Sequence, residues 1–211
     1  MPKIVDAEAR RREVAAAAAA LLVDGGRGAL TVRSVADAVG CSTTVVSHYF
    51  EDMADLVHAT YTIAVERSSK RIVQVLERDP ADIAALVEAV LPLDRVRHDD
   101  WRIWFAFWTE ALTSPTFATE QRARARTMLT RIEECLALLA DEGAVAPDVD
   151  LCLAARRLAA LVPGIAAEAT FDPSRWPPHR QREVLHSELA LLGLDPARRS
   201  ALEVEALPAV G

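Results

Sequence analysis

The sequence predicts an all-α fold of about nine helices, and three observations support this. Apolar residues recur at intervals of three and four along most of the 211 residues, which is the spacing of one helix face. Gly and Pro separate these periodic segments and mark their ends. Residues 31–50 have the pattern of two short helices joined by a tight turn. A hydrophobic content of 51% is ample for the core of such a fold.

The first predicted helix precedes this segment and is opened by Arg10, Arg11 and Arg12. The glycine-rich residues 25–28 stop it. Its apolar stripe consists of Val14, Ala17, Ala18, Leu21 and Leu22. The arginine cluster has two interpretations, which are a solvated helix start and a basic arm that reaches DNA phosphates or the minor groove.

Residues 31–50 have the features of a helix-turn-helix unit. Thr31 can cap a short helix whose apolar side chains share one face, namely Val32, Val35, Ala36 and Val39. Gly40 follows the last of these and can adopt the left-handed conformation that closes a helix. Ser42 is then the cap of a second helix over residues 43–50. A helix of this size fits the major groove of DNA.

The second of these helices has a polar outer surface. Val46 and Phe50 are four residues apart and can both point into a small core. The remaining side chains offer hydroxyl and ring groups that can bond phosphates or base edges. The predicted DNA-binding residues are Arg33, Ser42, Thr43, Thr44, Ser47, His48 and Tyr49. From the spacing alone, a helical hairpin in which Ser and Thr serve only as caps is an equal alternative.

The amino-acid sequence of this region resembles that of a known family. Preceded by ALLVDGGRGAL and followed by EDMADLV, residues 31–50 are similar to the N-terminal DNA-binding domain of the TetR family of bacterial transcription regulators. Within that family, GCSTTVVSHYF is most similar to the betaine-regulator (BetI-like) branch. The resemblance implies a dimeric repressor that binds double-stranded operator DNA and is released by a small molecule.

Two positions depart from the common family pattern. Ser47 stands where most members have Tyr, although the BetI-like branch resembles this chain there. Met53 stands where the family usually has a Lys that contacts a phosphate, and it is flanked by Glu51, Asp52 and Asp55. A nearby basic residue or the helix N-terminus itself could substitute for that contact.

The remaining periodic segments predict a helical body. Helices are expected over residues 52–79, 81–91, 101–112, 116–142, from 148 or 150 to 169, and 181–192, with a charged connector at 94–100. Pro163 and Gly164 predict a kink or a split in the fifth of these. The last two helices are expected to pair with their copies in a four-helix bundle. The predicted dimer interface consists of Leu158, Val162, Ile165, Leu185, Leu189 and Leu192.

The segment WRIWFAFWTEAL holds three of the four Trp residues. A helical projection places Trp101, Trp104, Phe105, Phe107, Trp108, Ala111 and Leu112 on one arc. Arg102, Thr109 and Glu110 fall opposite, so Glu110 is not expected to supply a counter-charge there. The arc is either packed core or the wall of an effector pocket. For the second reading the pocket residues are Trp101, Trp104, Phe105 and Trp108, which favour a cationic or quaternary-ammonium effector through cation–π attraction.

The resemblance extends into the body. The segments WRIWFAFWTEALTSP and ALVPGIAAEATFDPSRW are similar, more loosely, to the C-terminal ligand and dimer domain of the BetI type. The expected organisation is a three-helix DNA-binding domain at residues 1–51, a ligand-binding and dimerisation domain at 52–194, and a loosely ordered tail at 195–211.

Composition and motifs argue against other classes of protein. The net charge is −7, but residues 1–50 hold six basic and five acidic residues, so the acidity lies outside the proposed DNA-binding domain. The three Cys form no C-x-x-C pair, and the sequence contains no signal peptide or membrane-spanning run, which predicts a reduced cytoplasmic protein. The five His are scattered outside any catalytic motif, so no enzyme, metal or cofactor is expected. A DNA-binding dimer without an effector remains the alternative function.

Overall fold

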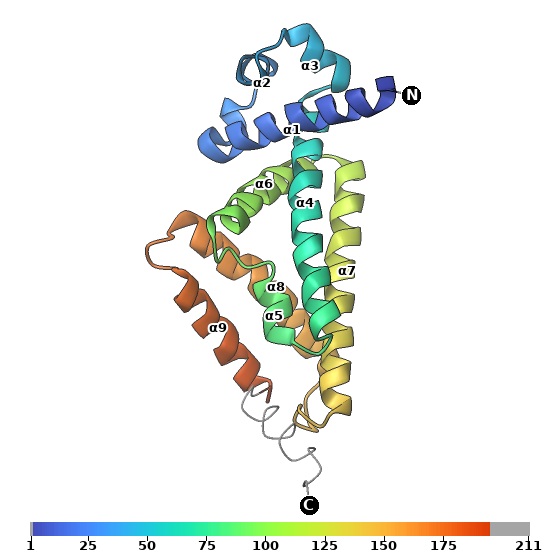
Figure 1. Cartoon of the computed structure of the whole chain (residues 1–211). Coiled ribbons are helices and arrows are strands. Elements are labelled where there is room, and N and C mark those ends of the chain that lie inside the picture. Colours follow the sequence, from blue (N-terminus) through green and yellow to red (C-terminus); the bar gives the residue numbers. More distant parts are fainter. Residues whose placement is uncertain (1, 195–211) are drawn as a thin grey trace, which may run out of the picture. The chain divides into compact units, whose positions relative to one another are not determined.

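The structure is a computed structural model that describes residues 2–194, with side chains from residue 7. The regular secondary structure of this part of the chain is all helix, joined by turns and loops (Figure 1). The prediction of an all-α fold is confirmed. The helices of the described part are α1 (Pro2–Ala29), α2 (Val32–Val39), α3 (Thr43–Tyr49), α4 (Met53–Arg78), α5 (Ile83–Glu88), α6 (Arg95–Ala111), α7 (Pro115–Asp141), α8 (Leu151–Phe171) and α9 (Pro178–Leu191). The predicted tail at 195–211 lies outside the described residues.

The described residues group into two compact units. The first contains residues 2–70 and 95–122, and the second contains residues 71–94 and 123–194. Helices α4 and α7 each contribute residues to both units. The predicted domain boundary after residue 51 therefore stays a prediction, because the first unit also includes α6 and part of α4.

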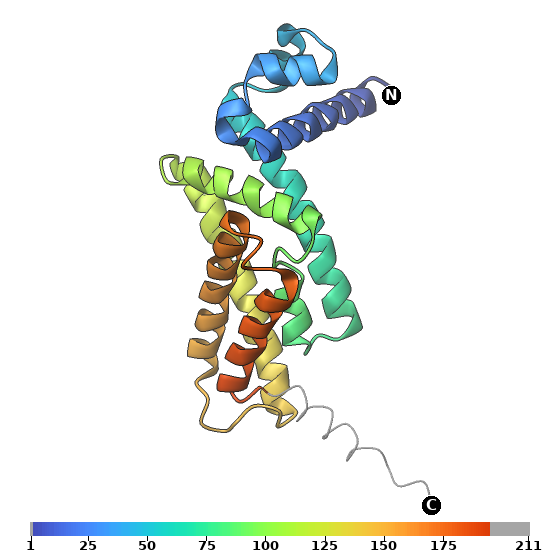
Figure 2. The same cartoon turned by 90° about the vertical axis from the view of Figure 1, so that its left-hand side faces the viewer.

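In the first unit, α1 packs against α2 on one side and α6 on the other (Figures 1 and 2). The shared core of α1 to α4 consists of Val14, Ala18, Leu22, Val35, Ala36, Val46, Phe50, Leu56 and Val57. Helix α1 begins at Pro2, so Arg10, Arg11 and Arg12 lie within it and do not open it. Gly26 interrupts its regular geometry with a φ of 68°, as the glycine cluster predicts, and the last turn ends at Ala29.

The predicted connector at residues 94–100 is wrong, because α6 begins at Arg95. Asp100 is completely buried, and the Nε of Arg67 on α4 donates a hydrogen bond to its Oδ1 at 2.8 Å. This ion pair compensates the buried charge of Asp100, which the local sequence alone would predict to be exposed to solvent. The helix therefore extends through a segment whose composition resembles a surface linker.

The second unit is built around α5, α8 and α9. Gln181 is buried and its Nε2 donates to the carbonyl oxygens of Pro92 and Trp176, at 3.1 and 2.9 Å. Arg182 on α9 pairs with Glu88 on α5 at 2.8 Å. Helix α8 runs through Pro163 as one element, so the predicted split does not occur. None of the helices within residues 2–194 combines the length and the hydropathy that a membrane crossing requires.

Candidate nucleic-acid interface and ligand site

Both predicted ends of α2 form as expected. The backbone N–H of Ser34 donates to the Thr31 hydroxyl oxygen, and the Thr31 N–H donates to the Ser34 hydroxyl oxygen, each at 3.0 Å. This reciprocal capping box satisfies two backbone donors at the helix start. At the other end Gly40 has φ 69° and ψ 38°, the left-handed conformation, and the Cys41 N–H donates to the Ala36 carbonyl oxygen at 2.9 Å.

Helix α3 has one buried and one exposed side. Val46 and the following Phe50 are 1% and 4% exposed, so they anchor the helix in the core. The side chains of Thr43, Thr44, Ser47 and His48 are exposed. Tyr49 is half-buried, with its ring edge-to-face on His48 at a centroid distance of 5.2 Å. We call the exposed group of Thr43, Thr44, Ser47 and His48 the α3 polar face.

Ser42 precedes α3 without donating or accepting a side-chain capping bond. Its exposed hydroxyl is therefore not used in starting the helix. A seven-residue helix without a cap is unstable in isolation, so α3 depends on the packing of Val46 and Phe50 for its shape.

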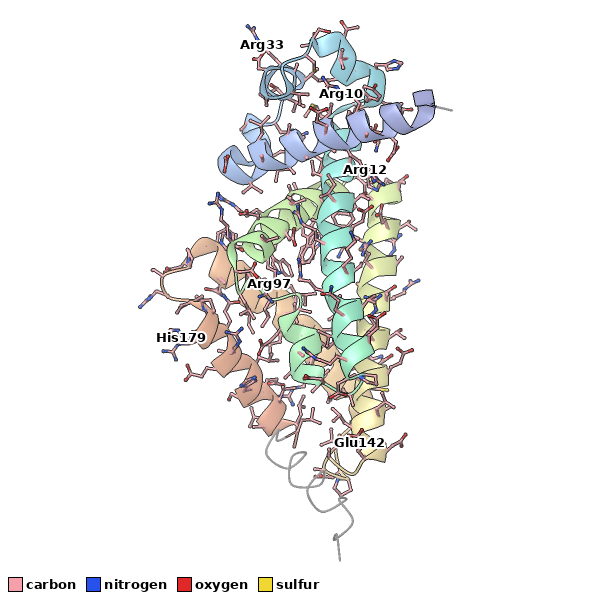
Figure 3. All side chains as sticks on the ribbon, in the orientation of Figure 1. Arg10, Arg12, Arg33, Arg97, Glu142 and His179 are labelled. Atoms are coloured by element: carbon pink, nitrogen blue, oxygen red, sulfur yellow. The ribbon has the colours of Figure 1, made fainter. Side chains whose placement is uncertain are left out.

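The arginines of residues 7–50 differ in their partners. Arg10 pairs with Glu13, Arg11 with Asp55, Arg12 with Glu8 and Arg27 with Glu110. Arg33 is exposed on α2 and, within the described residues, has no carboxylate partner. Figure 3 shows its side chain pointing outward from α2. Arg33 is therefore the arginine of this region whose charge is most available to an anion.

The contacts of Arg11 connect α1 with the end of α3 and the start of α4. The Arg11 guanidinium carbon lies 4.7 Å from the centroid of the Phe50 ring, and its NH2 lies 3.0 Å from the Asp55 Oδ1. The other oxygen of Asp55 accepts the Glu51 N–H at 3.2 Å. The Asp55 N–H in turn donates to Asp52 Oδ1 at 2.8 Å, so two carboxylates already occupy the start of α4. No spacing in the sequence brings Arg11 to Asp55, and sequence reasoning missed this contact.

The aromatic residues of α6 divide between two faces. Trp101 contacts Trp104, Phe105 and Trp108 at ring-centroid distances of 4.7, 5.4 and 5.8 Å. We call these four residues the α6 aromatic cluster. Trp101 and Trp104 are buried, whereas Phe105 and Trp108 are half-buried.

Phe107 lies outside this cluster, so the predicted single arc is wrong. Its ring stacks on Tyr61 of α4 at 3.6 Å and contacts Phe117 of α7 at 5.3 Å. Leu112 follows α6 and is 87% exposed. A helical projection at 100° per residue places all these side chains on one arc, because it contains no information on the neighbouring helices. In the structure, different neighbours cover two separate faces of α6.

Polar groups around the α6 aromatic cluster are unevenly satisfied. Glu110 pairs with Arg27 on α1 at 3.0 Å, in agreement with its predicted position away from the cluster. The Nε1 of Trp104 and the Nε2 of His98 are buried and have no hydrogen-bond partner among the described residues. Buried polar atoms without partners are rare in folded proteins, so these two nitrogens call for an explanation.

The six residues of the predicted dimer interface are buried within one chain. Their exposed fractions are 0–6% for Leu158, Val162, Ile165, Leu185, Leu189 and Leu192. These side chains are already covered within one protomer, and their part in a dimer interface stays a prediction. The large apolar side chains that α8 and α9 leave exposed are Leu153, Phe171 and Leu191.

Two family models match successive parts of the chain. Residues 14–60 match the family described as bacterial regulatory proteins, tetR family. Residues 79–193, more than half of the chain, match the family described as BetI-type transcriptional repressor, C-terminal. The chain belongs to the TetR family.

Individual TetR-family relatives cover most of the chain. It is similar to the HTH-type transcriptional regulator PksA of Bacillus subtilis, with 24% identity over 95% of this chain and 98% of PksA. It is also similar to the HTH-type transcriptional regulator BetI of Serratia proteamaculans, with 27% identity over 78% of this chain and 83% of that protein.

Solved structures agree with the TetR fold. A transcriptional regulator from Rhodococcus sp. Rha1 superposes with a TM-score of 0.76 at 26% identity, covering 86% of this chain and 95% of its own. A regulator from Saccharomonospora viridis, solved in complex with choline, gives a TM-score of 0.74 at 22% identity, covering 87% and 96%. At that identity the second likeness shows the fold alone.

Proposed function

We propose that this TetR-family regulator is a cytoplasmic homodimeric repressor that a small cationic effector releases from a palindromic operator. As a family member it is a DNA-binding transcriptional regulator. The observation that best supports DNA binding through α3 is its polar face. The side chains of this face are exposed, whereas Val46 and Phe50 are buried in the core. Hydroxyl and imidazole groups on a helix of this size suit hydrogen bonding to base edges in the major groove.

Arg33 is our candidate for the phosphate contact that Met53 cannot make. The start of α4 is occupied by the carboxylates of Asp52 and Asp55, which repel a phosphate. Arg33 is exposed and free of carboxylate partners within the described residues. With Ser42 and Tyr49 at the two ends of α3, it completes the proposed DNA-binding set.

Alanine substitution tests whether the α3 polar face binds DNA. Thr44→Ala and His48→Ala should each weaken binding to the operator at fixed salt, measured by fluorescence anisotropy, by about fivefold to a hundredfold. Both side chains are exposed, so the melting temperature should stay unchanged. Thr130→Ala, an exposed Thr on α7, is the matched control. Wild-type affinity in both α3 variants would remove the basis for this surface.

Dimerisation is proposed through the outer surfaces of α8 and α9. Leu153, Phe171 and Leu191 are 53%, 84% and 74% exposed in one protomer, and a second copy could bury them. Two copies would place α3 in major grooves about one helical turn or a little more apart. Light scattering on the purified protein should give the mass of a dimer, and a monomer at micromolar concentration would contradict the proposal.

The proposed effector site is the α6 aromatic cluster. Electron-rich ring faces attract cations by up to about 2 kcal/mol when desolvated. The choline complex of the Saccharomonospora viridis regulator, whose fold is similar, supports a small quaternary ammonium as the first compound to test. Effector binding is proposed to favour a body conformation that tilts α4 and changes the spacing of the two DNA-binding domains.

Two measurements decide between this function and an effector-independent dimer. Choline should raise the melting temperature and lower operator affinity, whereas its neutral isostere 3,3-dimethylbutan-1-ol should do neither. Equal effects of both compounds would argue against a cationic effector. Operator binding that no cationic or neutral compound alters would favour the effector-independent dimer.

A further inference from the structure

Helix α3 depends on contacts at its C-terminal end. It has seven residues, and Ser42 supplies no side-chain capping bond at its start. Phe50 follows its last turn, is 4% exposed, and donates its backbone N–H to the Val46 carbonyl oxygen at 3.1 Å. A helix this short does not keep its shape alone, so the groups that contact Phe50 influence how the α3 polar face is presented.

Arg11 of α1 lies against this end of α3. Its guanidinium carbon is 4.7 Å from the centroid of the Phe50 ring, a distance at which cation–π attraction acts. Its NH2 donates to the Asp55 Oδ1 on α4 at 3.0 Å. The side chains of Arg11 and Asp55 are 36% and 28% exposed, so solvent screens this ion pair less than a fully exposed one. One arginine therefore contacts both the residue that ends α3 and the helix that follows it.

Asp55 extends these contacts to the backbone of the turn between α3 and α4. Its Oδ2 accepts the Glu51 N–H at 3.2 Å, and its own N–H donates to the Asp52 Oδ1 at 2.8 Å. The arginine and the turn thus bind the two oxygens of one carboxylate. Loss of either charged group would remove a support that Phe50 and the turn share.

A phosphate contact is the alternative role for an arginine at the start of this chain. Arg10 and Arg12 pair with acidic residues of α1 itself. Arg11 instead bonds to Asp55 on α4 and stacks on Phe50, so it would have to leave both partners to reach a phosphate. Its contacts between helices therefore favour a role inside the DNA-binding domain.

We infer that Arg11 is a positioning residue for DNA recognition, which holds the α3 polar face in its binding orientation through Phe50 and Asp55. The inference rests on the proposed DNA binding through α3. When this support is lost, α3 samples orientations that do not match the major groove, and operator affinity falls with the fraction of molecules that still match. Binding to unrelated duplex depends mainly on charge and should change little.

Two variants test this role by fluorescence anisotropy at fixed salt, with an operator fragment and an unrelated duplex of equal length. Arg11→Lys keeps the charge without the planar guanidinium, and Asp55→Asn removes the carboxylate. Each should bind the operator about tenfold more weakly, as expected if about one tenth of the molecules keep the binding orientation. Each should bind the unrelated duplex within about twofold of wild type. The double variant should also lose about tenfold, because both changes remove the same support.

Asp55→Asn separates positioning from a phosphate contact by the sign of its effect. It removes a negative charge near the proposed interface and releases Arg11, so an Arg11 that binds phosphate would make the operator complex tighter. Positioning requires a weaker complex. Glu51→Gln removes the same charge from an exposed neighbouring side chain and should not weaken operator binding. Arg12→Lys, the matched control on α1, should bind the operator as the wild type does.

Backbone amide resonances of the free protein provide a readout that a general loss of stability does not move. In ¹⁵N-labelled Arg11→Lys, measured well below its melting temperature, the resonances of Phe50, Glu51 and the α3 polar face should shift. Those of Leu185 and Leu189 on α9 should not. Unshifted resonances throughout α3 would contradict the inference.

Tighter operator binding by Asp55→Asn, or wild-type operator affinity in Arg11→Lys, overturns the inference. Equal losses on the operator and on the unrelated duplex also overturn it, since positioning affects recognition and not general attraction to DNA. Thr44→Ala and His48→Ala distinguish this failure from failure of the proposed DNA-binding surface. If they weaken operator binding and the Arg11 variant does not, the α3 polar face stands and the role of Arg11 is rejected.

Discussion

Replacing Arg33 by Gln should change the salt dependence of operator binding more than any other property. Arg33 lacks a carboxylate partner in the described residues, whereas Arg10, Arg11, Arg12 and Arg27 each have one. Each protein–phosphate contact releases about 0.9 counterion from the duplex. A dimer contains two copies of Arg33, so the slope of log affinity against log salt should become shallower by about 1.8.

Fluorescence anisotropy with an operator fragment between about 50 and 200 mM salt measures this slope. At the lower salt concentration the variant should bind about tenfold more weakly relative to wild type than at the higher one. The exposed Arg126 on α7 provides the matched control, because Arg126→Gln removes the same charge outside the proposed interface.

An unchanged slope in Arg33→Gln would refute the reasoning, since an ion-paired or distant arginine gives that result. A shallower slope in Arg126→Gln of similar size would also refute it, because the effect would then report net charge and not a local phosphate contact. A weaker affinity with an unchanged slope would assign Arg33 a structural role.

Three further predictions concern stability and ionisation. Gly40→Ala should lower the free energy of unfolding by about 1 kcal/mol, because Gly40 has a positive φ of 69°; Gly28→Ala, where φ is not positive and nothing lies within 4 Å of the added Cβ, should not. Phe107→Ala should lower that free energy by about 3–5 kcal/mol in urea denaturation, since Phe107 is fully buried, and a smaller loss than about 2 kcal/mol would contradict its packing. The Ser174 hydroxyl, which donates at 2.6 Å, holds the pKa of the Asp172 carboxyl below its usual 3.8. The resulting stabilisation is present above that value and lost as the pH falls through the lowered pKa, so an NMR titration should place the midpoint below 3.8.

The helix-turn-helix region was predictable because its signals are local. A cap at Thr31 and a left-handed residue at Gly40 each act within one turn of backbone. The inward positions of Val46 and Phe50 follow from a spacing of four in one short helix. The selection of DNA-binding residues on the opposite side is a consequence of the same spacing, and it stays a prediction.

The errors arose where long-range contacts override local composition. Residues 94–100 have the charge of a linker, but Asp100 is buried and paired with Arg67 on α4, which favours helix there. Of the two outcomes predicted at Pro163, the split does not occur, since α8 continues through it with Val162 and Ile165 buried, and the kink stays a prediction.

The predicted dimer residues illustrate a different limit. The apolar spacing of Leu158, Val162 and Ile165 correctly predicts that this face of α8 is buried. An amphipathic pattern cannot distinguish a neighbour in the same chain from a second copy, because both bury the same apolar area. Only the burial of the folded protomer identifies these side chains as its own interior.

The division of α6 into two faces has a consequence for how this regulator can evolve. Phe107 and Asp100 hold the helix against α4, while Trp101, Trp104 and Phe105 lie between them in the chain and Trp108 follows Phe107. Residues that attach α6 to α4 and residues of the proposed effector site thus alternate within a few turns of one helix. With the effector site proposed here, substitutions among the four aromatic residues could change the compound that is bound, while Phe107 and Asp100 would still attach α6 to α4.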